Sequence, residues 1–304
     1  MTAASRSGPG SAGAAIVTAG PVPIGVSLST IGVGPEWWLD AVRRLEAAGY
    51  SAVWVWDHHL ARADGRGRAR SVLEAWTMLT AGAMATSRIA LGSHVLNVMN
   101  RHPALLARMA ATLQVLSGGR LVLGLGIGGN PLDHEPLGIP LPSVEERLAR
   151  LEETIAVLRA LWSGRPVELE GRFVRLRQAV IAPVPDPPPP IVVAGQSSRG
   201  ARLAARIGDG WTTPADRFER LRPVFEAGLL DAGRARSEVT VIVGFEGGRS
   251  GVDFLAGSPW IADPVGTWAR WRAAGADGVV VSARTEADVV ALLTAAERFR
   301  RAAG

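Results

Sequence analysis

Residues 89–125, IALGSHVLNVMNRHPALLARMAATLQVLSGGRLVLGL, contain one complete strand–helix–strand unit. Ile89–Val95 and Leu121–Leu125 are short apolar runs, the pattern of strands that are buried on both faces of a parallel sheet. Pro103–Leu116 lies between them and has the length and apolar spacing of a helix, and a Ser-Gly-Gly turn follows it. Because parallel strands need a crossover connection, the stretch predicts two parallel strands joined by a helix.

The same alternation of apolar runs and helical stretches continues on both sides of this unit. Strands are predicted at Ile24–Leu28, Ala52–Trp56, Ile89–Val95, Leu121–Leu125, Ile191–Ala194, Gly210–Thr213, Val239–Phe245 and Gly278–Ser282. Helices are predicted at Pro35–Ala48, Val72–Thr86, Pro103–Leu116, Ser143–Trp162, Arg199–Ile207, Arg217–Ala232, Pro264–Ala274 and Glu286–Ala302. Eight strands that each precede a helix predict an α/β fold of the (β/α)8 TIM-barrel type, whose active site lies at the carboxyl ends of the strands. A doubly wound open sheet in two domains is the alternative.

Several segments depart from this alternation. Residues 1–21 are rich in Gly, Ala and Ser, which predicts a flexible tail before a single barrel domain at 22–304. The Pro- and Gly-rich stretch Gly126–Pro142 and the near-alternating stretch Val167–Ile181 are expected to be insertions after the fourth strand, the second of them an antiparallel hairpin. Pro183–Pro190 cannot pair in a sheet, so it is expected to be an extended connector.

The composition of the 304 residues narrows the chemistry. The chain has no Cys and no Lys, so disulfides, thiolate nucleophiles and lysine Schiff bases are excluded. All 33 basic residues are Arg, and the net charge of +5 is spread over mixed-sign helix faces, which argues against a nucleic-acid partner. No apolar run reaches the roughly 18 residues that span a membrane, and the His spacing matches no metal motif. We therefore expect a cytoplasmic protein with neither a membrane nor a metal partner.

Polar residues follow the predicted strand Ala52–Trp56 at its carboxyl end, where the sequence reads Asp57-His58-His59. We interpret Asp57 as hydrogen-bonding the polar edge of a ligand ring. His58 is interpreted as a proton donor or acceptor, because imidazole titrates near neutral pH. A turn in which Asp57 caps backbone amides is the alternative.

Two further loops carry glycines after predicted strands. Residues 124–129, GLGIGG, resemble a dinucleotide fingerprint, but Pro131 and a long loop follow them instead of a helix. We interpret these glycines as allowing close backbone approach to a flat ligand, with a loop that needs positive φ angles as the alternative. Residues 195–200, GQSSRG, open a predicted helix and indicate either a phosphate cradle or an ordinary helix cap.

In combination these motifs resemble the bacterial luciferase-like superfamily. The matching stretches are Trp54–His58, Leu91–Pro103, Leu116–Gly129, Ser143–Trp162 and Ile191–Trp211. The resemblance implies a TIM-barrel oxidoreductase that uses the deazaflavin coenzyme F420 for hydride transfer, or alternatively a monooxygenase that uses reduced FMN and oxygen. A barrel that binds a flavin without catalysis is a further alternative. The ring is expected across the barrel mouth, with its phosphate near the loop after the fifth strand, and we expect a small-molecule substrate and a homodimer.

The resemblance also implies roles for individual residues. His58 is the expected catalytic residue, placed beside the reactive ring. The expected cofactor-binding residues are Asp57, Ser93, His94, Val95, Gly126, Gly128, Gly129, Gly195, Gln196 and Ser197, and the His94–Val95 peptide bond is expected to be cis. Ile127 stands where luciferase has an arginine that grips the FMN phosphate, which favours F420 over FMN. Ser29 and Gly129 stand near two glutamates of the sugar-phosphate dehydrogenases, which disfavours a sugar-phosphate substrate.

Overall fold

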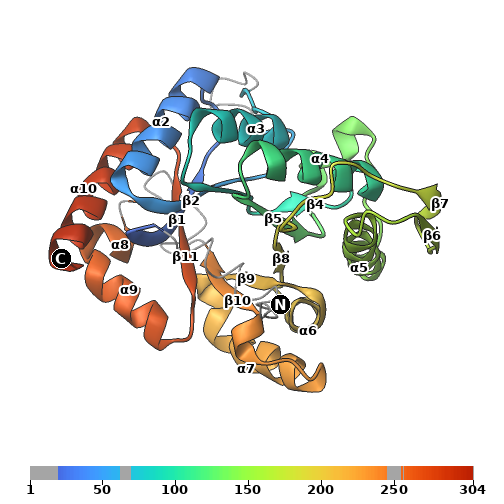
Figure 1. Ribbon diagram of the computed structural model, residues 1–304. Coiled ribbons are helices and arrows are strands. Elements are labelled where there is room, and N and C mark those ends of the chain that lie inside the picture. The colour runs from blue at the N-terminus through green and yellow to red at the C-terminus, as the bar shows by residue number, and fades with distance from the viewer. Residues whose placement is uncertain (1–19, 62–69, 245–254, 256, 304) are drawn as a thin grey trace, which may run out of the picture.

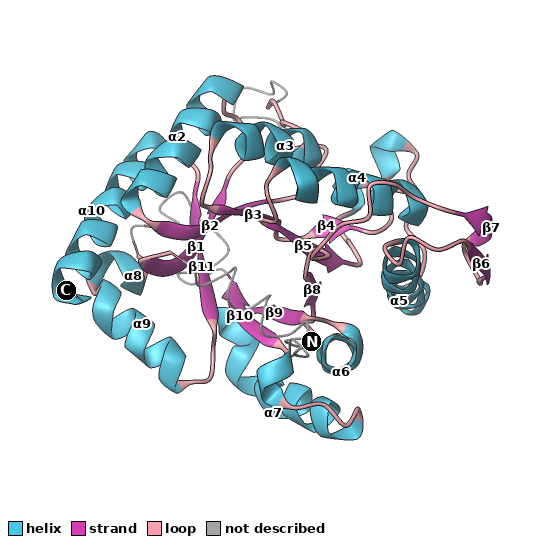
Figure 2. Cartoon of the chain, viewed as in Figure 1, coloured by secondary structure: helices cyan, strands magenta, loops and turns pink. Residues whose placement is uncertain are grey.

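The computed structural model describes residues 20–61, 70–244, 255 and 257–303 (Figure 1). The predicted tail, residues 1–21, lies outside the described residues except for Gly20 and Pro21, and so does Phe245 at the end of one predicted strand. Within the described ranges the chain forms a ring of strands surrounded by helices (Figure 2).

Eight parallel strands close into a barrel. They are β1 (Val22–Leu28), β2 (Tyr50–Val55), β3 (Ala90–Ser93), β5 (Leu121–Gly126), β8 (Ile191–Ala194), β9 (Gly210–Pro214), β10 (Thr240–Gly244) and β11 (Gly278–Ala283). The ring closes because β1 pairs with both β2 and β11, while β3 pairs with β5. The short strand β4 (Leu96–Asn97) pairs with the carboxyl end of β5. The predicted (β/α)8 barrel is confirmed, and the open-sheet alternative is wrong.

Helices cover the outside of the barrel. They are α2 (Pro35–Ala48), α3 (Ala75–Ala85), α4 (Pro103–Leu116), α5 (Val144–Leu161), α6 (Ser198–Ile207), α7 (Ala215–Asp231), α8 (Pro259–Ala262), α9 (Pro264–Ala273) and α10 (Glu286–Ala303). Short 3-10 helices are η1 (Pro131–Asp133), η2 (Glu135–Leu137) and η3 (Arg236–Glu238). The predicted helices agree within a few residues, and α8 has no counterpart in the prediction. α3 begins later than predicted because the Glu74 carboxylate caps it, accepting hydrogen bonds from the N–H groups of Trp76 and Thr77.

Arg120, directly before β5, joins this strand to the end of α3 and the start of β3. Its guanidinium donates hydrogen bonds to the carbonyl oxygens of Ala83 at 2.8 Å, Thr86 at 3.0 Å and Ile89 at 2.9 Å. These carbonyls lie at the end of α3 and just before β3. Arg120 therefore satisfies the last carbonyls of α3 and fixes this helix against the neighbouring strands.

The interior of the barrel is filled around Trp54. A compact cluster of buried side chains surrounds it, made up of Ala52, Trp54, Ala90, Val122, Val192, Ile242 and Val280. The indole fits because a Cβ atom on Gly25 or Gly92 would overlap it. This packed layer forms a floor beneath the mouth of the barrel.

The insertion after β5 carries a small hairpin beside α5. Strands β6 (Val167–Glu170) and β7 (Arg175–Ala179) pair in antiparallel fashion, as predicted, and project beyond α5, away from the barrel (Figure 1). The Glu153 carboxylate on α5 accepts hydrogen bonds of 2.6–2.9 Å from the N–H groups of residues 172–174 in the turn. The connector 183–190 lies outside the strands, as predicted. In the ranges described, the helices lack the length and apolar character that a membrane crossing requires.

Candidate active site

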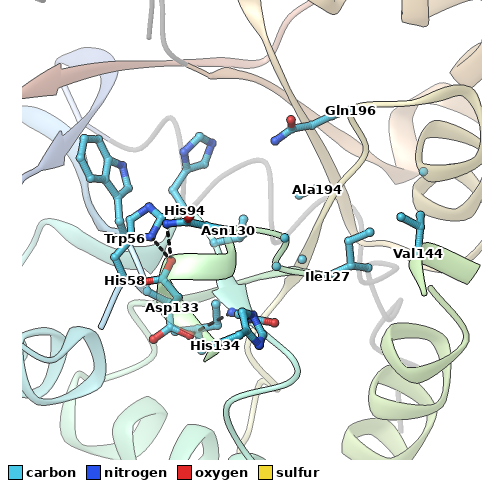
Figure 3. Close-up of a pocket in the computed structure, with 18 of the residues that line it drawn as sticks. Trp56, His58, His94, Ile127, Asn130, Asp133, His134, Val144, Ala194 and Gln196 are labelled. Atoms are coloured by element: carbon cyan, nitrogen blue, oxygen red, sulfur yellow. Dashed lines mark hydrogen bonds and ion pairs between the residues drawn. The ribbon is translucent and has the colours of Figure 1, made fainter. Parts of the chain in front are cut away.

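A cavity of about 640 Å³ opens at the carboxyl ends of the strands (Figure 3). This volume is within the range of pockets that bind small organic molecules. The wall combines the loops after several strands with side chains from α5 and α7. Its residues are Trp56, Asp57, His58, His94, Val95, Leu96, Asn97, Gly126, Ile127, Gly128, Gly129, Asn130, Asp133, His134, Val144, Leu148, Ala194, Gln196, Ser197, Gly200, Arg217 and Arg284.

All but two of the predicted site residues line this cavity. Those that do are Asp57, His58, His94, Val95, Gly126, Gly128, Gly129, Gln196 and Ser197. Ser93 is fully buried behind the wall, where its hydroxyl donates a 2.7 Å hydrogen bond to the carbonyl of Gly124. Gly195 packs against α6, and a Cβ atom at this position would lie 2.7 Å from the backbone of Gly200. Ser93 and Gly195 therefore shape the wall from behind.

His58 is oriented by a carboxylate that the sequence analysis did not identify. Its Nδ1 lies 2.7 Å from Oδ2 of Asp133, which comes from η1 after β5 (Figure 3). The His58 side chain is 41% exposed, whereas that of Asp133 is 5% exposed. Because the carboxylate accepts the proton of Nδ1, the neutral ring has its lone pair on Nε2.

Asp133 also ties two loops of the mouth together. Its carboxylate accepts hydrogen bonds from the N–H groups of His59 and Leu60 and from the side-chain amide of Asn130. Burial alone would raise the pKa of Asp133, but the hydrogen bonds from His58 and from the two backbone groups hold this pKa below its ordinary value. Asp133 is therefore a mostly buried carboxylate in the cavity wall that supports His58 at Nδ1. The only sequence signal was its place in a loop after a strand, because its partner lies 75 residues away.

Asp57 lines the cavity, and its carboxylate is held by several groups of the protein. Its two carboxylate oxygens accept a bidentate pair of hydrogen bonds from Arg101, at 2.7 and 2.9 Å. The backbone N–H of Asn97 and the side-chain amide of Asn100 donate to the same carboxylate. The side chains of Arg101 and Asp57 are 12% and 2% exposed, so this is a buried ion pair. Asp57 touches the cavity, but its charge is directed into the protein, where it fixes the loop after β3 to the end of β2.

His94 and Val95 form the part of the wall next to the barrel floor. The peptide bond between them is cis, as predicted. Nε2 of His94 lies 2.9 Å from the hydroxyl of Thr212, and its ring meets Trp54 edge to face at 5.8 Å between centroids. His94 is therefore a buried wall residue, unlike the half-exposed His58.

The glycines at the end of β5 and just after it are required mainly by the packing of the protein. A Cβ atom on Gly126 would lie 2.6 Å from Cγ2 of Val95. Gly128 has a φ angle of 65° and lies so close to Asn97 that a side chain there would overlap it. The interpretation as a loop that needs positive φ is therefore confirmed at Gly128, while close approach of a flat ligand to these glycines stays a prediction.

The far end of the cavity has the features of an anion site. The loop after β8 leads into α6, where the Ser197 hydroxyl accepts a hydrogen bond from the N–H of Gly200 and caps the helix. The first N–H groups of a helix have no intrahelical acceptor, so they attract an anion. Arg217 on α7 lines the cavity here and donates a 3.0 Å hydrogen bond to the carbonyl of Gln196. Arg217 is the cation that the sequence analysis missed, since its chain position carries no motif.

A second cation lies at the opposite side of the mouth. The Arg284 guanidinium, after β11, is 5.1 Å from the centroid of the Trp56 ring. Burial lowers the pKa of Arg284, and the positive charge of Arg70 lowers it further. The cavity thus has one arginine near the loop after β8 and another beside Trp56.

Residues 21–246 match the family described as luciferase-like monooxygenase. The chain belongs to this family. Among curated relatives, it is 37% identical over 197 residues to the F420-dependent glucose-6-phosphate dehydrogenase of Beutenbergia cavernae, covering 64% of this chain and 57% of the relative. It is 35% identical over 208 residues to the F420-dependent hydroxymycolic acid dehydrogenase of Mycobacterium tuberculosis, covering 66% of this chain and 57% of the relative. These matches span little more than half the length of either relative.

Solved structures of the luciferase-like fold are similar over most of the chain. An F420-dependent secondary alcohol dehydrogenase in complex with an F420–acetone adduct superposes with a TM-score of 0.75 and 21% identity, covering 90% of this chain and 98% of that chain. At this level of identity the likeness establishes the fold alone, and it agrees with the family match.

Proposed function

We propose that this member of the luciferase-like family is an F420-dependent oxidoreductase that transfers a hydride between the coenzyme and a small organic substrate. The observation that carries the proposal is the pairing of His58 with Asp133 at 2.7 Å inside the cavity, because it provides an oriented acid–base group. Both relatives named above are F420-dependent dehydrogenases, which supports F420 as the coenzyme.

The cavity has the parts that a deazaflavin nucleotide requires. Val95, Gly126 and Ala194 adjoin one another in the wall and would contact the ring, and the start of α6 with Arg217 would hold the phosphate. The chain has no Lys, so Arg217 would supply the positive charge beside the phosphate. When bound, F420 supplies or accepts the hydride.

His58 manages the proton that accompanies this hydride. Oxidation of a carbinol removes a hydride from carbon and a proton from oxygen, so a base must accept the proton. With Nδ1–H donating to Asp133, the lone pair on Nε2 of His58 is that base, and the resulting imidazolium is stabilised by the same carboxylate. In the reverse direction the imidazolium donates the proton from Nε2 to a carbonyl oxygen.

The substrate class that suits this proton transfer is a small hydroxyl or carbonyl compound. By the resemblance, Ser29 and Gly129 stand near the places of two glutamates of the sugar-phosphate dehydrogenases, which disfavours a sugar-phosphate substrate. The substrates in the relatives' names are therefore not assigned to this chain.

A coenzyme-dependent screen tests the proposal. Purified protein is mixed without oxygen with oxidised F420 and a panel of alcohols, or with reduced F420 and the matching carbonyl compounds, and the deazaflavin absorbance is followed. We expect a spectral change with at least one compound. Because free reduced FMN consumes oxygen by itself, the FMN arm of the test follows the compounds of the panel, and we expect that none of them is oxygenated when reduced FMN is supplied in air. An oxygenated product with reduced FMN, without any reaction of F420, would support the monooxygenase alternative instead.

A further inference from the structure

A second hollow lies beside the active-site cavity, between α5, α6 and α7. It has a volume of about 460 Å³ and shares Leu148 with the wall of the main cavity. α5 packs on α6 along this hollow (Figure 1). On α6, the first residue that lines this hollow is Arg199. Its neighbours Ser197 and Gly200 line the main cavity. The hollow therefore starts where the phosphate of a bound coenzyme would lie.

Three arginines of α6 face this hollow. Arg199, Arg202 and Arg206 are spaced three and four residues apart, which places them on one face of the helix. From the first to the last they extend about 10 Å along the helix axis. The hollow therefore presents a row of cations that leads away from the active site.

The carboxylates in the hollow balance only part of this charge. Glu152 forms two hydrogen bonds with Arg206, at 2.7 and 2.9 Å. Asp231 lies 3.5 Å from Arg202, and both of these side chains are more than half exposed, at 73% and 57%. Arg199 makes no hydrogen bond or ion pair with the described part of the chain. Two carboxylates against three guanidinium groups leave the hollow positive at the end nearest the active site.

We propose that this hollow binds the oligoglutamate tail of F420. The inference rests on the proposed function. In F420 the deazaflavin nucleotide is joined through its phosphate and a lactyl group to a chain of glutamates, so the coenzyme continues as a polyanion beyond the phosphate. A tail that leaves the start of α6 meets Arg199 first and Arg202 next. Its carboxylates compete with Asp231, whose long and exposed contact with Arg202 is weak.

Binding of two coenzyme forms tests the inference directly. The dissociation constant of the full-length protein is measured by coenzyme fluorescence, for F420 with several glutamates and for the form without glutamates. In wild type at low ionic strength, we expect the tail to improve affinity about fivefold to tenfold, the effect of one or two exposed ion pairs. This gain should shrink as salt is added.

Matched variants separate the hollow from the overall charge of the protein. In the double variant Arg199→Gln/Arg202→Gln, F420 with several glutamates should bind no more tightly than the form without glutamates. The dissociation constant of the form without glutamates should stay as in wild type. Arg43→Gln with Arg108→Gln removes the same charge from exposed positions on α2 and α4 and should keep the gain. Equal affinities of the two forms in wild type would overturn the inference, and so would an equal loss for both forms in the Arg199 and Arg202 variant. If neither form binds, the proposed function fails, and the inference fails with it.

Discussion

The imidazole of His58 and the carboxylate of Asp133 come from loops after different strands and meet at 2.7 Å. His58 follows β2, whereas Asp133 ends the 3-10 helix after β5. The barrel brings them together because the carboxyl ends of parallel strands all lie at one mouth. In the proposed mechanism this pair is the acid–base group, and Nε2 of His58 is the nitrogen that exchanges the proton.

Replacing His58 should separate chemistry from binding. We expect His58→Ala to lower turnover by roughly 10²-fold or more, because the proton then has no oriented acceptor. The dissociation constant of F420, measured by fluorescence, should change little. His59→Ala is the matched control, since the His59 backbone contacts Asp133 but its side chain lies outside the cavity wall. Full turnover of His58→Ala across the pH range would show that the proton moves elsewhere.

Asp133→Asn should act through His58 without removing it. An asparagine amide can donate to Nδ1, which stabilises the wrong tautomer, so turnover should fall by about tenfold or more and the pH–rate profile should change. Glu135→Gln makes the same chemical change at an exposed position of the same loop and should leave both unchanged. An unaltered pH–rate profile in Asp133→Asn would argue against the positioning role.

The stability of the same variant should depend on pH in a defined direction. The pKa of Asp133 is below its ordinary value in the folded protein, so its carboxylate stabilises the fold above pH ~4 and loses this effect as the pH falls through the lowered pKa. Near neutral pH, urea unfolding should therefore show a larger free energy of unfolding for wild type than for Asp133→Asn. This difference should shrink in acid. A difference that grows in acid would contradict this linkage.

The buried pair of Asp57 and Arg101 should contribute mainly to stability. Asp57→Ala leaves the Arg101 guanidinium without its bidentate partner, so the free energy of unfolding should fall by about 3 kcal/mol. Arg101→Met should have a similar effect, and the double variant should lose less than the sum of the two. Asp40→Ala, which breaks an exposed pair with Arg44, should cost under ~1 kcal/mol. If Asp57→Ala weakened coenzyme binding while Arg101→Met did not, the original interpretation of Asp57 as a ring ligand would be supported.

Arg217 should contribute to affinity for the phosphate part of the coenzyme. Arg217→Gln is expected to weaken F420 binding about tenfold, and to leave binding of a phosphate-free deazaflavin unchanged. Arg220→Gln, an exposed change on the same helix, is the control. Equal weakening of both ligands would place Arg217 at the ring instead.

Local patterns in the sequence predicted the fold well. The helix Pro35–Ala48 has its predicted bounds because Pro35 begins it and Gly49, with a φ angle of 90°, ends it. The positions of the cavity loops followed from the barrel, since residues at the carboxyl ends of strands must meet. The bounds of helices and strands depend on residues that are close together in the sequence, so they can be predicted from one sequence.

The partners of the site residues could not be predicted in this way. Asp57 was identified, but its partner Arg101 lies 44 residues away, and nothing in the sequence showed that its carboxylate would be saturated inside the protein. Asp133 and Arg217 were missed because their roles depend on how loops and helices pack at the mouth. Ser93 and Gly195 were placed in the correct loops, yet their depth behind the wall is a property of the packed structure.

Isothermal titration of the purified protein with F420 and with FMN tests the central claim most directly. The account predicts that F420 binds more tightly than FMN, because Ile127 stands where the resemblance to luciferase would place an arginine that binds the FMN phosphate. Tight binding of FMN without detectable binding of F420 would contradict it and leave the FMN-dependent monooxygenase as the better description.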